Sequence, residues 1–293
     1  MKLSGTITAL ITPFSGDGSV DYGALRSLVE NQTATGIEGI CSVGTSGESP
    51  TLSHDEHHKV IEKTIEFAAG KCKIIAGTGA NSTSEAVSLT KAAIAAGGAD
   101  ACLQVTPYYN KPNPEGLYRH FMTVADLGLP VVLYNVPGRT GREIPLDIVA
   151  RLAKHPNIVA IKEAAGSVER VSAIKNRIPD FTVLSGDDSL ALPMASVGAE
   201  GVISVASNVI PQEMGDMMRL ALAGDFVGAR AIHAKYYPLF HDLFIDVNPV
   251  MVKEALWLMK KVERVFRLPL CETDDAKLER MKETLASLGL ISR

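Results

Sequence analysis

One lysine of this 293-residue chain stands in an environment that suits covalent chemistry. Lys162 directly follows the apolar residues 158–161, and such a run is typical of a strand that is buried on both faces. Burial favours a neutral amine over an ammonium ion, and a neutral amine attacks a carbonyl carbon to form a Schiff base. Two simpler interpretations stay open, in which Lys162 reaches solvent or pairs with Glu163.

Side chains at the ends of other strand-like runs complement this lysine. Tyr134 and Thr45 carry hydroxyls that are suited to move protons during imine formation. Arg139 lies in a Pro-Gly-Arg-Thr turn, where a guanidinium can bind a substrate carboxylate through two hydrogen bonds. The alternatives are a tyrosine that caps the core and an arginine that is only solvated.

Two further motifs raise the question of anion or metal binding. Residues 44–48 read Gly-Thr-Ser-Gly-Glu, and the backbone N–H groups of such a turn can surround a carboxylate. His54 and His57 share one helix face, but their spacing matches no known set of metal ligands. The pair Asp187 and Asp188 is expected to cap a helix. Metal catalysis is therefore not expected.

The elements that must position these residues recur along the chain. Short β-branched runs alternate with amphipathic stretches about every 28 residues. Eight such units predict an α/β fold, a closed (β/α)8 TIM barrel, whose catalytic groups lie at the carboxyl ends of the strands. The predicted strands begin near Thr6, Glu38, Lys73, Ala99, Pro130, Ile158, Phe181 and Glu200.

Helix signals between the strands give the domain organisation. A capping box at Ser53 and Glu56 predicts one helix start, and Pro145 is expected in the first turn of another. Further helices are predicted over residues 21–32, from 82 to the glycines at 97–98, and over 211–223. Residues 1–224 are predicted to form the catalytic barrel. Residues 225–293 show no strand pattern and predict a C-terminal extension of about three helices, over 226–244, 249–260 and 274–288.

Composition excludes several other classes of protein. The chain is 46% hydrophobic and has a formal net charge of −4, which argues against disorder and against the basic stripe that nucleic-acid binding needs. No uncharged stretch is long enough to span a membrane, and the first residues lack the apolar region of a signal peptide. The cysteines form no C-x-x-C pair, so a cytoplasmic protein is expected; they are Cys41, Cys72, Cys102 and Cys271.

Several of these motifs together resemble those of a known family. Residues 44–48, 134–137 and 161–162 are similar to the motifs of the pyruvate-dependent class I aldolases of the N-acetylneuraminate lyase superfamily. The resemblance covers essentially the whole chain. Residues 106–110, with the sequence Thr-Pro-Tyr-Tyr-Asn, and 139–140 favour the dihydrodipicolinate synthase family within it.

This resemblance implies an activity and a catalytic set. Lys162 is implied to form an imine with pyruvate, which condenses with L-aspartate 4-semialdehyde to give 4-hydroxy-tetrahydrodipicolinate, in lysine and diaminopimelate biosynthesis. Thr45, Tyr134 and Tyr109 are implied to form a proton relay, with Tyr109 supplied by a neighbouring subunit. The reaction uses no metal and no organic cofactor in this family.

The same resemblance implies the residues that bind substrate. Thr45 and Ser46 hold the pyruvate carboxylate, and Arg139 binds the carboxylate of the semialdehyde. Gly186 and Ile203 line the lysine through backbone groups. The family often has threonine where this chain has Ser46, but serine keeps the hydroxyl.

A second, regulatory site and an assembly are also implied. Feedback inhibition by L-lysine is expected at a tight-dimer interface, and the family usually forms a homotetramer of two tight dimers. Pro50 stands where an alanine contact is common. The positions that match the inhibitor site are Ser49, His54, His57, Asn81, Glu85 and Tyr108.

Two alternative functions stay open. A related aldolase or lyase acting on a sugar acid or another 2-oxo acid would share Lys162 and Tyr134, whereas Arg139 and Tyr109 favour the synthase. A catalytically silent barrel could instead serve as an amino-acid sensor or transcriptional co-regulator. The complete set of lysine, tyrosine and threonine argues against that second alternative.

Overall fold

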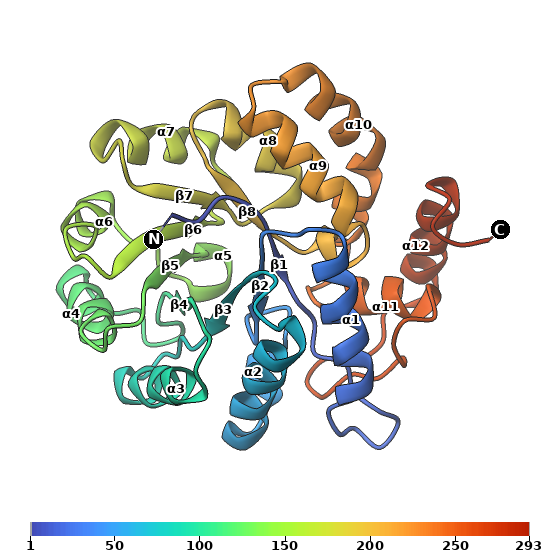
Figure 1. Ribbon diagram of the computed structural model, residues 1–293, viewed down its shortest axis with the longest axis horizontal. Coiled ribbons are helices and arrows are strands. Elements are labelled where there is room, and N and C mark those ends of the chain that lie inside the picture. The colour runs from blue at the N-terminus through green and yellow to red at the C-terminus, as the bar shows by residue number, and fades with distance from the viewer. Residues whose placement is uncertain (1, 293) are drawn as a thin grey trace.

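The computed structural model describes residues 2–292, in which eight parallel strands close into a barrel in chain order (Figure 1). This confirms the predicted (β/α)8 fold with a C-terminal helical extension. Each strand begins within two residues of its predicted start, because continuous apolar runs mark strands that are buried on both faces. The strands are β1 Gly5–Ala9, β2 Gly39–Ser42, β3 Lys73–Gly77, β4 Ala101–Val105, β5 Val131–Asn135, β6 Ile158–Glu163, β7 Thr182–Ser185 and β8 Gly201–Ser204.

Helices surround this barrel as an outer ring (Figure 1). Two short 3₁₀ turns, η1 Ser49–Thr51 and η2 Ala206–Asn208, follow strands β2 and β8 and lie near the mouth. The helices of the ring and its loops are α1 Tyr22–Ala34, α2 His54–Ala68, α3 Thr83–Ala96, α4 Pro114–Ala125, α5 Pro137–Thr140, α6 Leu146–Leu152, α7 Val168–Arg177, α8 Asp188–Ser196 and α9 Pro211–Leu222.

Local capping chemistry explains where several helices begin. Ser53 and Glu56 form the predicted capping box, in which the serine side chain accepts from the Glu56 N–H and the Glu56 carboxylate accepts from the Ser53 N–H. Pro145 was expected in the first turn of α6, but it occupies the N-cap with extended backbone instead. The four-residue helix α5 was not predicted, and it carries Arg139.

Asp187 and Asp188, which follow β7, do not cap α8 with their side chains as predicted. Asp187 occupies the N-cap position of α8, but its side chain makes no capping hydrogen bond. The buried carboxylate of Asp188 accepts hydrogen bonds from the backbone N–H groups of Val205 and Ala206. Asp188 therefore stabilises the start of η2 rather than α8, because two donors at that turn lack backbone partners. Burial raises the pKa of Asp188 to about 6.

The C-terminal extension packs along one side of the ring (Figure 1). Its helices are α10 Phe226–Asp242, α11 Val250–Leu258 and α12 Asp275–Ser287, close to the predicted ranges, and α10 lies against α8 and α9. Buried apolar side chains of the extension belong to the same core as those of the barrel. We propose residue 224 as the boundary between barrel and extension, since the last helix of the ring ends just before it.

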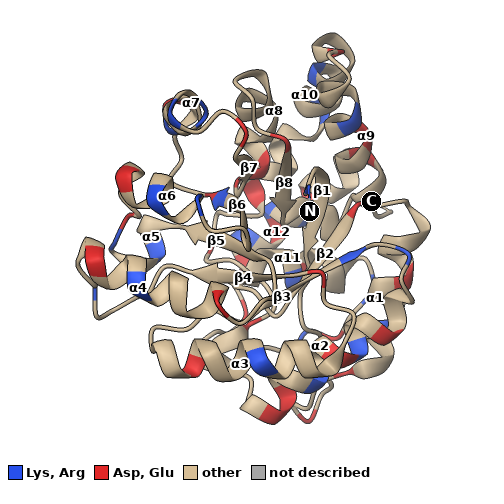
Figure 2. Cartoon of the chain, turned by 60° about the vertical axis from the view of Figure 1, so that its left-hand side comes forward, with Lys and Arg blue, Asp and Glu red and all other residues tan. Residues whose placement is uncertain are grey.

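Charges on the outer helices are mixed in sign. Figure 2 shows Lys and Arg interspersed with Asp and Glu over these helices. All four cysteines are free thiols. Within residues 2–292, no helix combines the length and the apolar character that a membrane crossing requires.

Candidate active site

The loop after β2 begins with a strained turn at the mouth of the barrel. Val43 has a φ of 55°, which is costly for a β-branched residue and is typical of functional sites. The turn passes directly over the end of β3, where a Cβ on Gly77 would lie 2.2 Å from the Val43 carbonyl oxygen. Glycine at residue 77 therefore allows the Gly-Thr-Ser-Gly-Glu loop to cross the barrel mouth.

This loop leaves two backbone donors free. The N–H groups of Gly47 and Glu48 donate to the carbonyls of Gly44 and Thr45, at 3.1 Å each. Within residues 2–292, the N–H groups of Thr45 and Ser46 donate to no protein acceptor. Two adjacent free N–H groups can form a concave anion-binding site. The loop can therefore accept an anion such as a carboxylate.

Lys162 lies beside Tyr134, as the pairing of β6 with β5 requires. These two residues are register partners, and the Lys162 Nζ atom lies 4.4 Å from the centroid of the Tyr134 ring. The Lys162 side chain is almost fully buried, with 6% of its surface exposed. It lines an inner cavity of about 80 Å³ that also includes Thr45 and Ser46. Strand pairing therefore sets the amine against the tyrosine.

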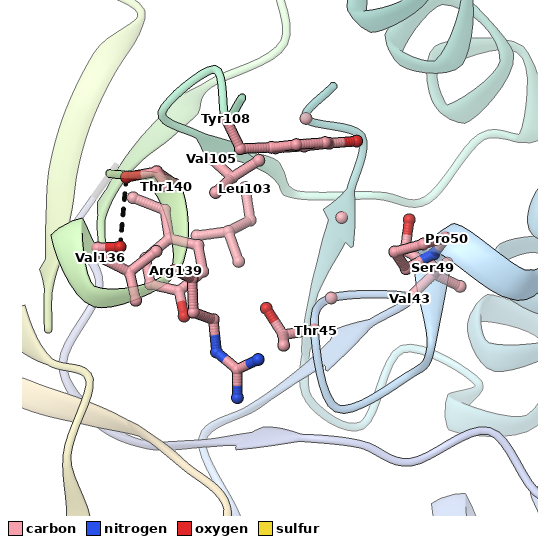
Figure 3. Close-up of a pocket in the computed structure, with 14 residues that line it drawn as sticks. Val43, Thr45, Ser49, Pro50, Leu103, Val105, Tyr108, Val136, Arg139 and Thr140 are labelled. Carbon is pink, nitrogen blue, oxygen red and sulfur yellow. Dashed lines mark hydrogen bonds between the residues drawn. The ribbon is translucent and has the colours of Figure 1, made fainter. Parts of the chain in front are cut away.

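An outer cavity of about 200 Å³ opens from the same residues toward solvent. Thr45, Tyr134 and Arg139 line both cavities. In Figure 3, Arg139 and Thr45 lie at one opening, and Tyr108 and Ser49 extend from other loops around it. The α5 turn that carries Arg139 is closed by a hydrogen bond from the Thr140 hydroxyl to the Val136 carbonyl. The two cavities together have room for two small substrates.

The C-terminal extension also reaches this site, which the sequence did not predict. Phe244 and Asn248 line the inner cavity. Asn248 donates from Nδ2 to the Ser46 hydroxyl oxygen at 3.0 Å, and its backbone carbonyl accepts from Arg139 at 3.2 Å. The sequence shows Asn248 only as a polar residue just before a predicted helix. Nothing in the sequence indicates that this residue lies over the mouth of the barrel.

Three other predicted site residues occupy different surroundings. Gly186 lines the inner cavity, and a Cβ there would lie 2.5 Å from the Ala164 Cβ atom, so glycine is required. Ile203 is buried in β8 and is not a lining residue of that cavity. Tyr109 is 91% exposed and has a φ of 71°, and it lines neither cavity of this chain.

The six residues predicted for the inhibitor site cluster near the starts of α2 and α3. His54 and Glu85 form an exposed pair at 3.0 Å, and His57 is buried. Burial is the main cause that lowers the pKa of His57 to about 4. Ser49 and Tyr108 line the outer cavity, which links this region to the active site. The sixth residue, Asn81, accepts a hydrogen bond at its carbonyl from the side chain of Asn110.

A buried polar network lies behind the lysine, on the outside of the barrel. Asn135 donates to both oxygens of Glu163, at 2.8 and 3.0 Å, and Arg170 donates to the same carboxylate at 2.8 Å. Asn135 also accepts from the backbone N–H of Ile144. Burial raises the pKa of Glu163, and Arg170 opposes that shift. Since Glu163 bonds this network, it does not pair with Lys162.

Basic and acidic side chains line the inner cavity together. They are Lys162, Arg139 and Asp187. Burial raises the pKa of Asp187, and Lys162 opposes that shift. Burial also raises the pKa of the Cys41 thiol to about 11, so it stays uncharged beside the lysine. Within residues 2–292, no three His, Cys, Asp or Glu side chains gather as a metal-ion site.

Fold and site together define a (β/α)8-barrel enzyme with a buried lysine at the end of its sixth strand. The chain belongs to the dihydrodipicolinate synthetase family, whose model matches residues 2–288. This confirms the resemblance seen in the motifs. Family membership and the named relatives make the chain a lyase of lysine and diaminopimelate biosynthesis, of the 4-hydroxy-tetrahydrodipicolinate synthase type.

Individual relatives match over nearly their whole length. The 4-hydroxy-tetrahydrodipicolinate synthase of Hydrogenobaculum sp. is 52% identical over 291 residues, which are 99% of this chain and 100% of the relative. The dihydrodipicolinate synthase of Acinetobacter baumannii, solved in complex with pyruvate, has a TM-score of 0.97 at 44% identity and covers 99% of this chain and 100% of its own. The enzyme of Cyanidioschyzon merolae, solved with lysine bound, has a TM-score of 0.95 at 40% identity, covering 98% and 99%.

Proposed function

We propose that this enzyme condenses pyruvate with L-aspartate 4-semialdehyde through a Schiff base on Lys162. The observation that carries the proposal is the buried amine of Lys162 beside the Tyr134 ring, in a cavity that also presents the free N–H groups of Thr45 and Ser46. An amine held next to a carboxylate-binding loop suits a 2-oxo acid, because the loop fixes the acid group and brings the adjacent carbonyl to the amine.

The reaction balances with the release of one water molecule. The Lys162 amine adds to C2 of pyruvate and water leaves, which gives the imine. Loss of a proton from C3 gives an enamine, whose C3 attacks the aldehyde carbon of the second substrate. The amino group of that substrate then displaces the Lys162 amine at C2, and the ring of 4-hydroxy-tetrahydrodipicolinate closes.

Proton transfer in these steps is assigned to three hydroxyls. Tyr134 and Thr45 line the cavity around the amine. Within residues 2–292, no hydrogen bond joins Lys162, Tyr134 and Thr45 to one another, and we propose that the relay forms once substrate is bound. We assign the third hydroxyl to Tyr109 of a neighbouring subunit, which agrees with its 91% exposure in this chain. The proposed assembly is a homotetramer of two tight dimers.

The two substrate carboxylates are assigned to separate groups. Pyruvate is assigned to the hydroxyl and N–H groups of Thr45 and Ser46, and the semialdehyde to the guanidinium of Arg139 at the cavity mouth. Gly186 and Ile203 are assigned backbone contacts around the lysine. Pyruvate as a substrate is supported by the A. baumannii relative, which was solved with pyruvate.

Borohydride trapping tests the imine directly. The protein is incubated with pyruvate and sodium borohydride, and the reduced adduct is located by intact mass and peptide mapping. The expected result is one adduct on Lys162, absent from the Lys162→Ala variant. The peptide of Lys253, which is also buried, is the internal control. A folded protein that gives no adduct would contradict the Schiff-base mechanism.

We further propose that L-lysine inhibits this enzyme at the cluster formed by Ser49, His54, His57, Asn81, Glu85 and Tyr108. The carboxylate of Glu85 and the hydroxyls of Ser49 and Tyr108 can bind an ammonium group, and His54 can bind a carboxylate. The relative from C. merolae, solved with lysine bound, supports this proposal.

Initial rates with and without saturating L-lysine test the inhibition. We expect a lower rate and a raised melting temperature in wild type, and a weaker response in Glu85→Ala. An unchanged rate together with an unchanged melting temperature would refute the proposal.

A further inference from the structure

Asn248 connects the two substrate-binding groups of the active site, although it lies outside the barrel. We infer that Asn248 is a positioning residue, which orients the Ser46 hydroxyl toward the pyruvate carboxylate and tethers Arg139 at the same time. This inference rests on the proposed function. It assigns a role in substrate binding to the C-terminal extension, because Asn248 stands between α10 and α11.

Because Asn248 is buried, the hydrogen bond from its side chain to Ser46 is costly to lose. The residue is 6% exposed, and its Nδ2 lies 3.0 Å from the Ser46 hydroxyl oxygen, which is also buried. A buried amide that loses its partner costs more than an exposed one, because water cannot replace the bond. The hydrogen bond between Asn248 and Ser46 is therefore costly to break.

The direction of this hydrogen bond determines whether the Ser46 hydroxyl can donate its proton to a ligand. The amide Nδ2 donates, so the Ser46 oxygen accepts and its own proton stays free for another acceptor. The free N–H groups of Thr45 and Ser46 belong to the same loop. Two N–H donors and one O–H donor then converge on a single anion, and a carboxylate supplies the acceptor oxygens for all three.

The backbone of the same residue serves the second subsite. The Asn248 carbonyl accepts from Arg139 at 3.2 Å, while Arg139 lines both the inner and outer cavities. Side-chain replacement leaves this backbone contact in place. Variants of Asn248 should therefore affect pyruvate binding far more than semialdehyde binding, which a general loosening of the structure would not do.

The experiment measures KM for each substrate, with the pyruvate dependence of borohydride trapping as a second readout. In Asn248→Ala, KM for pyruvate should rise about tenfold, with KM for the semialdehyde within about twofold of wild type. Ser46→Ala should show the same rise, and the double variant should be no worse than Ser46→Ala alone. The neighbouring Val247→Ala, a half-exposed position, is the matched control and should behave as wild type.

Asn248→Asp separates positioning from packing. The aspartate keeps the shape of the side chain, but it accepts the Ser46 proton and places a negative charge beside the pyruvate carboxylate. KM for pyruvate should therefore be higher in Asn248→Asp than in Asn248→Ala, whereas a purely structural role predicts the reverse order.

Three outcomes would overturn the inference: a pyruvate KM in Asn248→Ala equal to that of wild type, a smaller defect in Asn248→Asp than in Asn248→Ala, or additive effects with Ser46→Ala. Each of these is meaningful only if wild-type Lys162 is trapped by pyruvate. Failure of the wild-type trapping would refute the proposed function instead.

Discussion

At the scale of single residues, the site presents two neighbouring groups that can bind anions. The free N–H groups of Thr45 and Ser46 are one of them, and the guanidinium of Arg139 is the other. Among residues 2–292, Asp187 is the one carboxylate that lines the inner cavity. This charge pattern suits a reaction between two substrates that each carry a carboxylate and a carbonyl group.

Replacement of Arg139 should separate the two substrates. In Arg139→Ala we expect KM for L-aspartate 4-semialdehyde to rise about 10- to 100-fold, since a hydrogen-bonded charge pair is lost, while KM for pyruvate changes little. Steady-state kinetics with each substrate varied in turn measures this. Arg119→Ala, on the exposed face of α4, is the control. Equal effects on both substrates would indicate that the second substrate is a different compound.

At the scale of elements, the pairing of β5 with β6 places Tyr134 beside Lys162. The next pair along the same strands is Asn135 and Glu163, whose side chains hydrogen-bond on the outer face of the barrel. Arg170 from α7 neutralises Glu163 and donates to the Ile144 carbonyl as well. One polar network therefore ties two strands, one helix and the loop before α6 into a fixed register behind Lys162.

Loss of Arg170 should strongly destabilise the fold around the network of Asn135, Glu163 and Arg170. Arg170→Met leaves the Glu163 carboxylate buried without its cation, so we expect the free energy of unfolding to fall by about 3–5 kcal/mol. The double variant with Glu163→Gln should recover at least half of this loss, because the neutral amide needs no cation. Urea denaturation of the two variants and wild type measures both effects. A double variant as unstable as Arg170→Met would show that packing, rather than the buried charge, is responsible.

A buried histidine of α4, His120, which faces the start of α3, should make stability depend on pH. His120 is 4% exposed and its Nδ1 lies 3.0 Å from the Thr83 hydroxyl at the start of α3. Burial lowers the pKa of His120 to about 4, below its ordinary value of 6.5. Between these values the unfolded chain binds a proton and the folded chain does not, so stability is lost as the pH falls below 6.5.

The expected loss from His120 is about 2 kcal/mol between pH 7 and pH 5. It is measured as the difference in unfolding free energy between wild type and His120→Gln at the two pH values, which cancels the contributions of carboxylates common to both proteins. A difference that does not change with pH would mean that the pKa of His120 is the same in the folded and unfolded states.

The elements were predictable from sequence to different degrees. The starts of β6 and α2 follow from local signals, namely an apolar run and a capping box, and the structure confirms both. The contacts of Glu163 and Asn248 were not predictable, because each depends on residues that are distant in the chain. Residue 248 and residue 46 are 202 positions apart, and only the closed barrel brings them together.

At the scale of the whole molecule, the extension and the barrel mouth are joined by buried charge as well as by apolar packing. Lys253 of α11 forms an ion pair with Glu48, the last residue of the Gly-Thr-Ser-Gly-Glu loop, and both side chains are buried. The Lys253 ammonium also lies 4.3 Å from the centroid of the Phe14 ring. This ion pair thus ties the loop that is proposed to bind pyruvate to α11 of the extension.

One member of the proposed relay lies on the outside of this molecule. Tyr109 is exposed in this chain, whereas Tyr134 and Lys162 are buried. If Tyr109 acts in a neighbouring subunit, each active site combines residues of two chains. Two inactive variants, Tyr109→Phe and Lys162→Ala, then carry complementary defects.

Hybrid assemblies of these two variants should regain activity. In a hybrid dimer, the site that keeps Lys162 receives Tyr109 from the other chain and is complete, while the second site lacks both. Random pairing at equal amounts should restore about one quarter of the wild-type specific activity. The measurement is the turnover of co-expressed, differently tagged variants after purification through both tags, which removes assemblies of a single variant and, for a tetramer of two tight dimers, raises the expected value to about 0.3. Activity no greater than that of the separate variants would place Tyr109 in its own chain's site or outside the reaction.

A positive result would make assembly itself a condition of catalysis, so dilution that dissociates the dimer should abolish turnover without unfolding the barrel.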